Sequence, residues 1–102
     1  MEQTRKYRDY LVEKLRDPRE AAAYLKAALA EFEQDGEAEA FLLALRSVVE
    51  ATGGVSRLAD KTNLNRQHLY RTLSGTSNPK LSTLGTILGG LGFRLSIEEA
   101  HH

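Results

Sequence analysis

Apolar residues recur at helical spacing through the first half of the chain. Tyr7, Leu11 and Leu15 stand four residues apart and Tyr10 broadens their stripe, so a first helix is predicted over residues 4–16. Two further helices follow it. The first of them continues through the apolar positions Ala21, Leu25, Ala28, Leu29 and Phe32. The other is predicted to bury Phe41, Leu42, Leu45, Val48 and Val49.

Local signals mark the ends of the second and third predicted helices. The run Asp17-Pro18-Arg19-Glu20 combines a capping aspartate, a proline at the first helical position and a glutamate three residues after the cap. This run predicts a helix start, and the helix is expected to stop near Gly36. The next helix is expected to begin at Glu37 and to end at Gly53-Gly54.

The second half of the chain predicts two short helices joined by a sharp turn. In the first of them Val55, Leu58 and Ala59 share one buried face. The small side chain of Ala59 lets a second helix cross closely. Asn63 follows, and asparagine tolerates the left-handed backbone conformation that a sharp turn requires.

The second short helix is predicted over residues 66–73. Leu64 is expected to anchor the turn by packing into the core, and Asn65 is expected to accept a hydrogen bond from the amides that begin the helix. On a helical wheel Leu69 and Leu73 lie together and face inward. The opposite face is therefore outward.

The outward side chains are of types that bind DNA. Glutamine pairs with adenine, and arginine pairs with guanine through two donors, when a helix enters the major groove. The base-reading candidates are Gln67, Arg71, His68, Arg66 and Asn65. Phosphate oxygens suit the polar groups beside this helix and in the loop after it, and the backbone candidates are Ser56, Tyr70, Ser74, Thr76, Ser77, Asn78 and Lys80. The alternatives are that Gln67 and Arg71 are ordinary exposed surface and that Tyr70 caps the core.

The C-terminal part predicts one more helix and a strand. The helix covers residues 82–91, with Leu84, Ile87, Leu88 and Leu91 inward. Phe93, Leu95 and Ile97 then alternate with polar residues, which is typical of a short strand. The strand is expected to pair with a two-fold mate or a bound protein; the alternative is a loosely attached extended tail. Gly89-Gly90 indicates either close helix approach at an interface between copies or a frayed helix end.

These residues resemble a known family of DNA-binding proteins. The run from Arg57-Leu58-Ala59 through Asn78-Pro79 resembles the Cro/C1-type (XRE-like) helix-turn-helix, and the similarity extends to Leu81-Ser82-Thr83-Leu84 and Leu91-Gly92. The resemblance implies a lambda-repressor-like fold. Two departures leave the operator sequence open: Asn63 replaces the usual turn glycine, and Leu73-Ser74 stands where many members carry charged residues.

The wider layout is similar to the HigA-like antitoxins, the addiction-module antidotes of type II toxin–antitoxin pairs. The similar segments are Tyr10-Leu11, Ala23-Tyr24-Leu25-x-Ala27-Ala28-Leu29, Phe41-Leu42-x-Ala44-Leu45 and the helix from Asn65 to Ser74. This resemblance implies that the protein represses its own operon. It also implies that the N-terminal helices neutralise a small RelE/ParE-like toxin.

Charge is unevenly distributed along this formally neutral chain. Residues 1–52 carry eight basic and eleven acidic side chains, a balance of −3, and residues 53–102 carry six basic and three acidic, a balance of +3. Such a molecule can present its positive side to phosphate and its negative side to a basic protein, although charge halves also differ by chance. The acidic run Glu31, Glu33, Asp35, Glu37 and Glu39 is expected to be a solvated edge or a contact with a basic partner.

Other chemistries find little support. The chain has no cysteine, His68 is its only internal histidine, and no serine has a paired base and carboxylate at a recognisable spacing, so we expect no metal, no cofactor and no enzyme. No apolar run approaches the roughly 20 residues that cross a bilayer, and Met1-Glu2-Gln3-Thr4 begins no secretory signal, so we expect a cytoplasmic protein. His101-His102 are interpreted as a tag remnant.

Taken together, the patterns predict an all-α bundle with one short C-terminal strand. Residues 1–52 form N-terminal helices, residues 53–98 the DNA-binding region and residues 99–102 a tail, within a single compact domain. The expected function is a homodimeric repressor that binds a palindromic operator as the antitoxin of a toxin–antitoxin pair. The alternatives are a stand-alone phage-type transcriptional regulator and a protein-interaction module without DNA binding.

Overall fold

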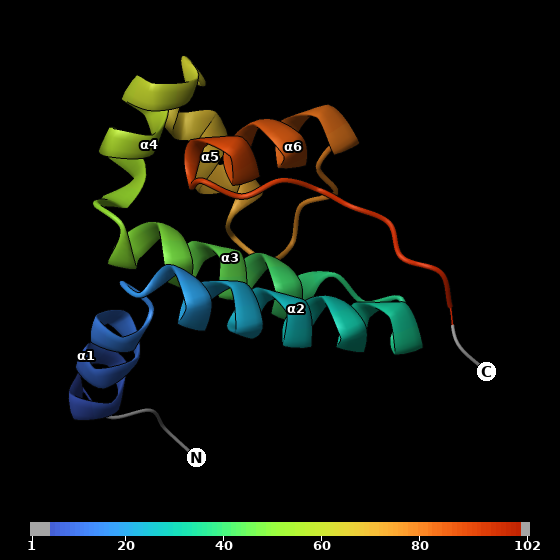
Figure 1. The fold of residues 1–102 in the computed structure, drawn as a ribbon. Coiled ribbons are helices and arrows are strands. Elements are labelled where there is room, and N and C mark those ends of the chain that lie inside the picture. The colour runs from blue at the N-terminus through green and yellow to red at the C-terminus, as the bar shows by residue number, and fades with distance from the viewer. Residues whose placement is uncertain (1–4, 101–102) are drawn as a thin grey trace.

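The computed structural model describes residues 5–100, and helices make up most of this part of the chain (Figure 1). They are α1 (Arg5–Lys14), α2 (Pro18–Asp35), α3 (Glu39–Ala51), α4 (Gly54–Thr62), α5 (Arg66–Thr72) and α6 (Leu81–Gly90). Two predictions, the helix start at residue 4 and the tag remnant at His101-His102, lie outside the described residues. The all-helical character of the bundle is confirmed.

Two layers of helices enclose the core. α2 and α3 lie side by side and run antiparallel, while α4, α5 and α6 form the second layer (Figure 1). α3 contacts α1, α2 and α4, and α4 in turn contacts α5 and α6, so these two helices connect the layers. The most deeply buried side chains are Leu15, Leu42, Leu45, Val48, Val49, Leu69, Leu73 and Ile87. Each contributes about 1.5–3 kcal/mol of hydrophobic stabilisation.

The predicted boundaries of α2 are confirmed. The Oδ1 atom of Asp17 accepts a hydrogen bond from the backbone N–H of Arg19 at 2.9 Å, and Pro18 occupies the first turn. Gly36 ends the helix with φ 74°, a left-handed conformation that glycine adopts without steric cost. α3 begins two residues later than predicted, at Glu39, because the Asp35 carboxylate accepts the N–H of Glu37 and holds the linker in a turn.

Four members of the apolar patterns of α1 and α2 are exposed. Tyr7 is 48% exposed and Tyr10 62% exposed, because α1 is short and reaches the core through Leu11 and, just past its end, Leu15. Leu29 and Phe32 are also exposed, at 39% and 38%. The core ends near Leu25 and Ala28, and the last two turns of α2 extend beyond it.

The predicted C-terminal strand is not formed within the described residues. Residues 93–100 are extended but irregular, and no strand occurs among residues 5–100. The beginning of this segment is anchored by a hydrogen bond from the N–H of Phe93 to the carbonyl of Leu88 at 2.8 Å. A strand needs a neighbour to complete its ladder, and the fold offers α6 rather than another strand.

Gly90 serves close packing inside one chain. A Cβ atom at this position would lie 2.6 Å from Cγ2 of Thr62 and 2.8 Å from Cδ1 of Leu58, both on α4. A Cβ at Gly89 would meet nothing within 4 Å. Gly90 therefore lets α6 approach α4 within one chain. The two expectations for the glycine pair, an interface between copies or a frayed helix end, stay predictions.

Candidate nucleic-acid interface

A tight turn at Asn63 separates α4 from α5. Asn63 has φ 61° and ψ 18°, and among residues 5–100 it alone combines a side chain with a positive φ. Its N–H donates to the carbonyl of Ala59 at 2.9 Å, which closes the last turn of α4. The predicted bend is confirmed, and it places the next helix across the first.

Asn65 starts α5 as predicted. Its backbone is extended, and its Oδ1 atom accepts the N–H of His68 at 3.1 Å. The cap uses the side-chain oxygen of Asn65, so the two amide N–H donors remain available to a ligand. Thr62 supports the turn before it, since its hydroxyl donates to the carbonyl of Leu58 and accepts from the N–H of Leu64.

Packing determines which face of α5 is outward. Leu69 and Leu73 are fully buried, and Val55, Leu58 and Ala59 are buried on α4 as predicted. The five base-reading candidates Asn65, Arg66, Gln67, His68 and Arg71 are all exposed. The predicted orientation of this helix is therefore confirmed, and its base-reading role stays a prediction.

Two candidates from different helices meet at the start of α5. The Nη1 atom of Arg66 donates to the Oγ atom of Ser56 at 2.8 Å. Ser56 lies in the first turn of α4, so the contact ties the beginnings of α4 and α5 together. A guanidinium has five N–H donors, and the others remain free for a phosphate or a base edge.

The loop after α5 is held by its own hydroxyl groups. Ser77 donates to the carbonyl of Thr72 at 2.7 Å, and Ser74 donates to that of Arg71 at 2.8 Å and lies 3.1 Å from the Thr76 hydroxyl. Gly75 has φ 94° and packs against the start of α3. Among the backbone candidates, Ser74 and Ser77 thus shape the loop. Tyr70, Thr76, Asn78 and Lys80 present exposed side chains.

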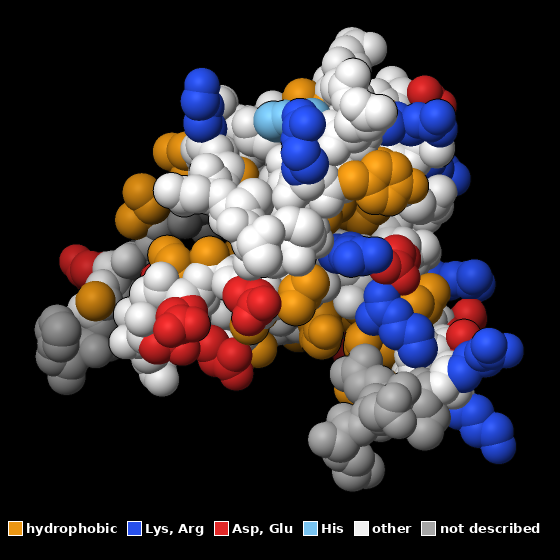
Figure 2. All heavy atoms as spheres, turned by 180° about the vertical axis from the view of Figure 1, so that it is seen from behind, with side chains coloured by type: hydrophobic (Ala, Val, Ile, Leu, Met, Phe, Trp, Pro, Cys, Tyr) orange, Lys and Arg blue, Asp and Glu red, His pale blue; other side chains and the backbone are white. Residues whose placement is uncertain are grey.

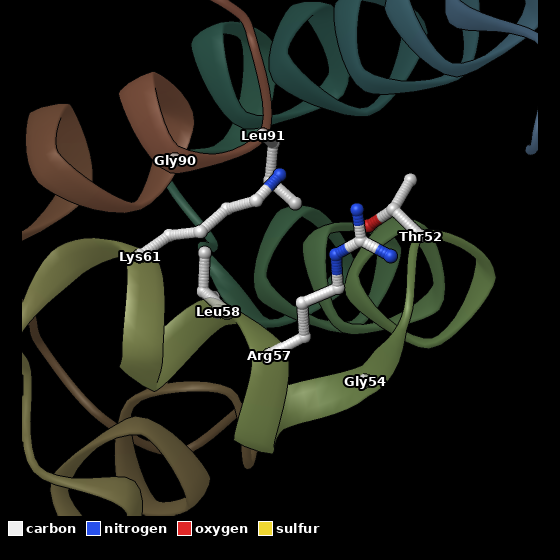
Figure 3. Close-up of a pocket in the computed structure, with 7 residues that line it drawn as sticks. All are labelled: Thr52, Gly54, Arg57, Leu58, Lys61, Gly90 and Leu91. Carbon is white, nitrogen blue, oxygen red and sulfur yellow. The ribbon is translucent and has the colours of Figure 1, made fainter.

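The basic side chains of the C-terminal half of the chain do not all lie on the same face of the molecule. Arg57 and Lys61 extend together from α4 toward Thr52 and Leu91, where they line a cavity of about 40 Å³ (Figure 3). That cavity lies at the carboxyl ends of α3 and α6, whose partial negative charge favours cations. Arg57 and Lys61 stand four residues apart, next to Leu58, and this spacing places them on one side of α4. The signal was present in the sequence, but a count of basic residues does not reveal it. Arg66, Arg71 and Lys80 remain at α5 and its loop.

Figure 2 shows the separation of charge over the surface. Lys and Arg side chains stand around the exposed histidine on the α5 side, and acidic side chains gather over the end of α2 and the start of α3. The acidic residues Glu31, Glu33, Asp35, Glu37 and Glu39 are all exposed. Within residues 5–100, no ion pair shorter than 4.0 Å involves Arg66, Arg71 or Lys80.

Metal-binding clusters and membrane-spanning helices are absent from the described part of the chain. Residues 5–100 contain no group of three or more His, Cys, Asp and Glu side chains that could hold a metal ion. Over the same residues, no helix has the length and apolar character that a bilayer crossing needs.

Comparisons with known proteins cover almost the entire chain. An uncharacterized protein of Haemophilus influenzae (strain Rd) is 28% identical over 98 residues, which make up 95% of this chain and 96% of that protein. No solved structure shows significant similarity. A family model described as "Probable addiction module antidote protein" matches residues 6–99. With a match of that extent, this chain belongs to the family of probable addiction module antidote proteins.

Proposed function

We propose that this chain is a sequence-specific DNA-binding repressor that uses α4, the Asn63 turn and α5 as a Cro/C1-type helix-turn-helix. The observation that carries the proposal is the orientation of α5. Buried Leu69 and Leu73 hold one side of the helix, and exposed Gln67 and Arg71 project from the other. These two side chains have the donors and acceptors that distinguish base pairs in the major groove.

The dimensions of α5 suit the major groove. Its seven residues make a rod about 10 Å long, and an α-helix with its side chains is about 10–12 Å across, which matches the groove width of about 12 Å. Gln67 and Arg71 are separated by about 6 Å along the helix axis, close to two base-pair steps of about 3.4 Å. We expect Gln67 to contact an adenine and Arg71 a guanine two steps away, flanked by His68 and the Asn65 amide.

Polar groups around α5 would position the helix on the phosphates. Lys80 and Asn78 are exposed in the loop, and Ser56 and Arg66 form a donor pair at the other end of α5. Phosphate contacts at both ends orient a helix without reading sequence. A homodimer would place two such helices in half-sites about 34 Å apart on a palindromic operator.

The family supplies the biological setting. An antidote implies a toxin partner of some kind. We assign the chain more closely to the HigA-like antitoxins, which would repress their own operon and bind a RelE/ParE-like toxin through α1 to α3. The acidic excess of residues 1–52 and the exposed acidic run support contact with a basic toxin. In this role the protein acts in the cytoplasm, uses no cofactor and has no enzymatic activity.

Salt dependence tests DNA binding. Fluorescence anisotropy with a duplex from upstream of the chain's own reading frame should give an affinity that falls steeply with salt, by a log–log slope of about −0.9 per neutralised phosphate. A flat response would favour a protein-interaction module, which the neutral charge of the chain also allows. Co-purification of a small basic protein from the native host would separate an antitoxin from a stand-alone regulator.

A further inference from the structure

A groove of about 540 Å³ runs along α3, on the side of the molecule bounded by α1 and α2. α1 contributes Arg8, α2 contributes Tyr24, and α3 contributes Leu43, Arg46, Ser47 and Glu50. None of these residues belongs to the DNA-binding candidates. The proposed function assigns α1 to α3 as a whole to a toxin, but it gives the residues of this groove no individual role.

The groove has an uncompensated positive charge at one end. Glu50 pairs with Arg8 at 2.6 Å and with Arg46 at 3.4 Å, and Arg8 also donates to the hydroxyl of Ser47 at 2.9 Å. One carboxylate is thus shared by two guanidinium groups. The side chain of Arg46 is 51% exposed, so its guanidinium can pair with a second carboxylate that comes from outside the groove.

The other end of the groove offers apolar surface. Leu43 lies one helical turn before Arg46 and is 41% exposed, and Tyr24 of α2 also lines the groove. A fitting ligand therefore carries an apolar side chain followed closely by carboxylates.

The C-terminal segment of this chain has that order of side chains. Ile97 is 98% exposed, and Glu98 and Glu99 follow it directly, also exposed. Residues 93–100 follow a stretched course without helix or strand (Figure 1), and at about 3.3 Å per residue they span up to about 26 Å. The stretch of α3 from Leu43 to Glu50 is only about 10 Å long, so the segment can leave α6 and still lie along the groove.

The segment is directed away from the groove of its own chain. Leu95 lies beside Gly85 on the surface of α6, and the tail continues past the end of α2, while α1 stands at the opposite end of the molecule (Figure 1). A second copy can supply the segment instead.

We propose that the C-terminal segment of one copy docks in the α1–α2–α3 groove of a second copy, and that the exchange is reciprocal. Ile97 packs on Leu43 and Tyr24, and Glu98 and Glu99 lie beside Arg46 and Arg8. The exchange makes a two-fold symmetric dimer, because the same two surfaces are used twice. This inference goes beyond the proposed function, since it assigns the partner surface and not the DNA contact.

Charge reversal tests the pairing in the full chain. Glu98→Lys/Glu99→Lys and Arg46→Glu should each weaken dimerisation by about tenfold or more in light scattering after size exclusion, because each places like charges together. An equimolar mixture of the two variants should restore the dimer. The control Arg16→Glu, on an exposed residue outside the groove, should leave the mass unchanged.

Engineered disulfides test the same contact without reversing any charge. The chain has no cysteine, so an Ile97→Cys chain mixed with a Leu43→Cys chain has one cross-linking site on each partner. Mild oxidation should give the mixed disulfide dimer, identified by mass spectrometry, and an Arg16→Cys chain in place of Leu43→Cys should not. A monomer at all concentrations, a dimer that neither charge variant weakens, or absence of the mixed disulfide would overturn the proposal. These readouts do not involve DNA, so their failure leaves operator binding intact.

Discussion

Arg66, the first residue of α5, donates a hydrogen bond to the hydroxyl of Ser56, in the first turn of α4, at 2.8 Å. The contact connects the two helices at the edge where a DNA backbone would pass. Because both side chains are exposed, the contact contributes little to folding, and under the proposed function it would orient the guanidinium for DNA binding.

The Ser56–Arg66 pair is expected to act as a unit in DNA binding. Ser56→Ala and Arg66→Ala should each lower operator affinity, and the double variant should lose less than the two effects added. A double-mutant cycle in anisotropy titrations measures this coupling, expected within about 0.5–3 kcal/mol. Strict additivity would show that the hydrogen bond does not orient Arg66 for binding.

Asn63 is expected to determine the stability of the turn. Asn63→Ala should lower the free energy of unfolding by about 1–2 kcal/mol, since alanine in a left-handed conformation places Cβ against the following carbonyl. Asn63→Gly is the matched control and should preserve stability, because glycine has no Cβ. Urea unfolding of both variants measures the difference. Equal stability of the alanine and glycine variants would contradict the role given to this backbone conformation.

The two neighbouring glycines of α6 should respond in opposite directions. Gly90→Ala forces Leu58 and Thr62 to shift and should destabilise the protein by about 1–3 kcal/mol. Gly89→Ala meets open space and should stabilise it by about 0.5–1 kcal/mol through the better helix propensity of alanine. Thermal unfolding compares the two. A Gly90→Ala variant as stable as Gly89→Ala would mean that α6 does not approach α4 this closely.

Arg71 is expected to read one base pair. Arg71→Ala should weaken specific binding by about 1–3 kcal/mol and relax preference at a single operator position. A selection from random duplexes followed by sequencing measures the preference. Arg19→Ala, an exposed arginine at the start of α2, is the control and should change neither quantity. An unaltered preference in the Arg71→Ala variant would remove this residue from base reading.

Lys80 is expected to contact phosphate instead. Lys80→Ala should weaken binding to operator and unrelated duplexes alike and should reduce the log–log salt slope by about 0.9 for each half-site that the homodimer occupies. Titrations at several salt concentrations check both effects. A loss confined to the operator would reassign Lys80 to sequence recognition.

Local sequence signals were sufficient for the helices and the turn. Asp17 and Pro18 begin α2, Asn63 bends the chain and Asn65 caps α5, each through contacts within a few residues. The inward faces of α3 and α4 also followed from the sequence, since helical periodicity places buried side chains together. These short-range effects depend little on the rest of the fold.

Tertiary structure decided which apolar side chains are buried and which charged side chains pair with each other. The 3.6-residue period placed Phe32 on the apolar stripe of α2, but only the extent of the opposing core shows that the end of α2 passes beyond it. Alternation predicted a strand at Ile97, but a strand requires a neighbour, and residues 5–100 supply none within one chain. The pairing of Arg8 with Glu50 joins residues 42 positions apart, a contact that spacing along the chain does not reveal because it depends on how helices pack.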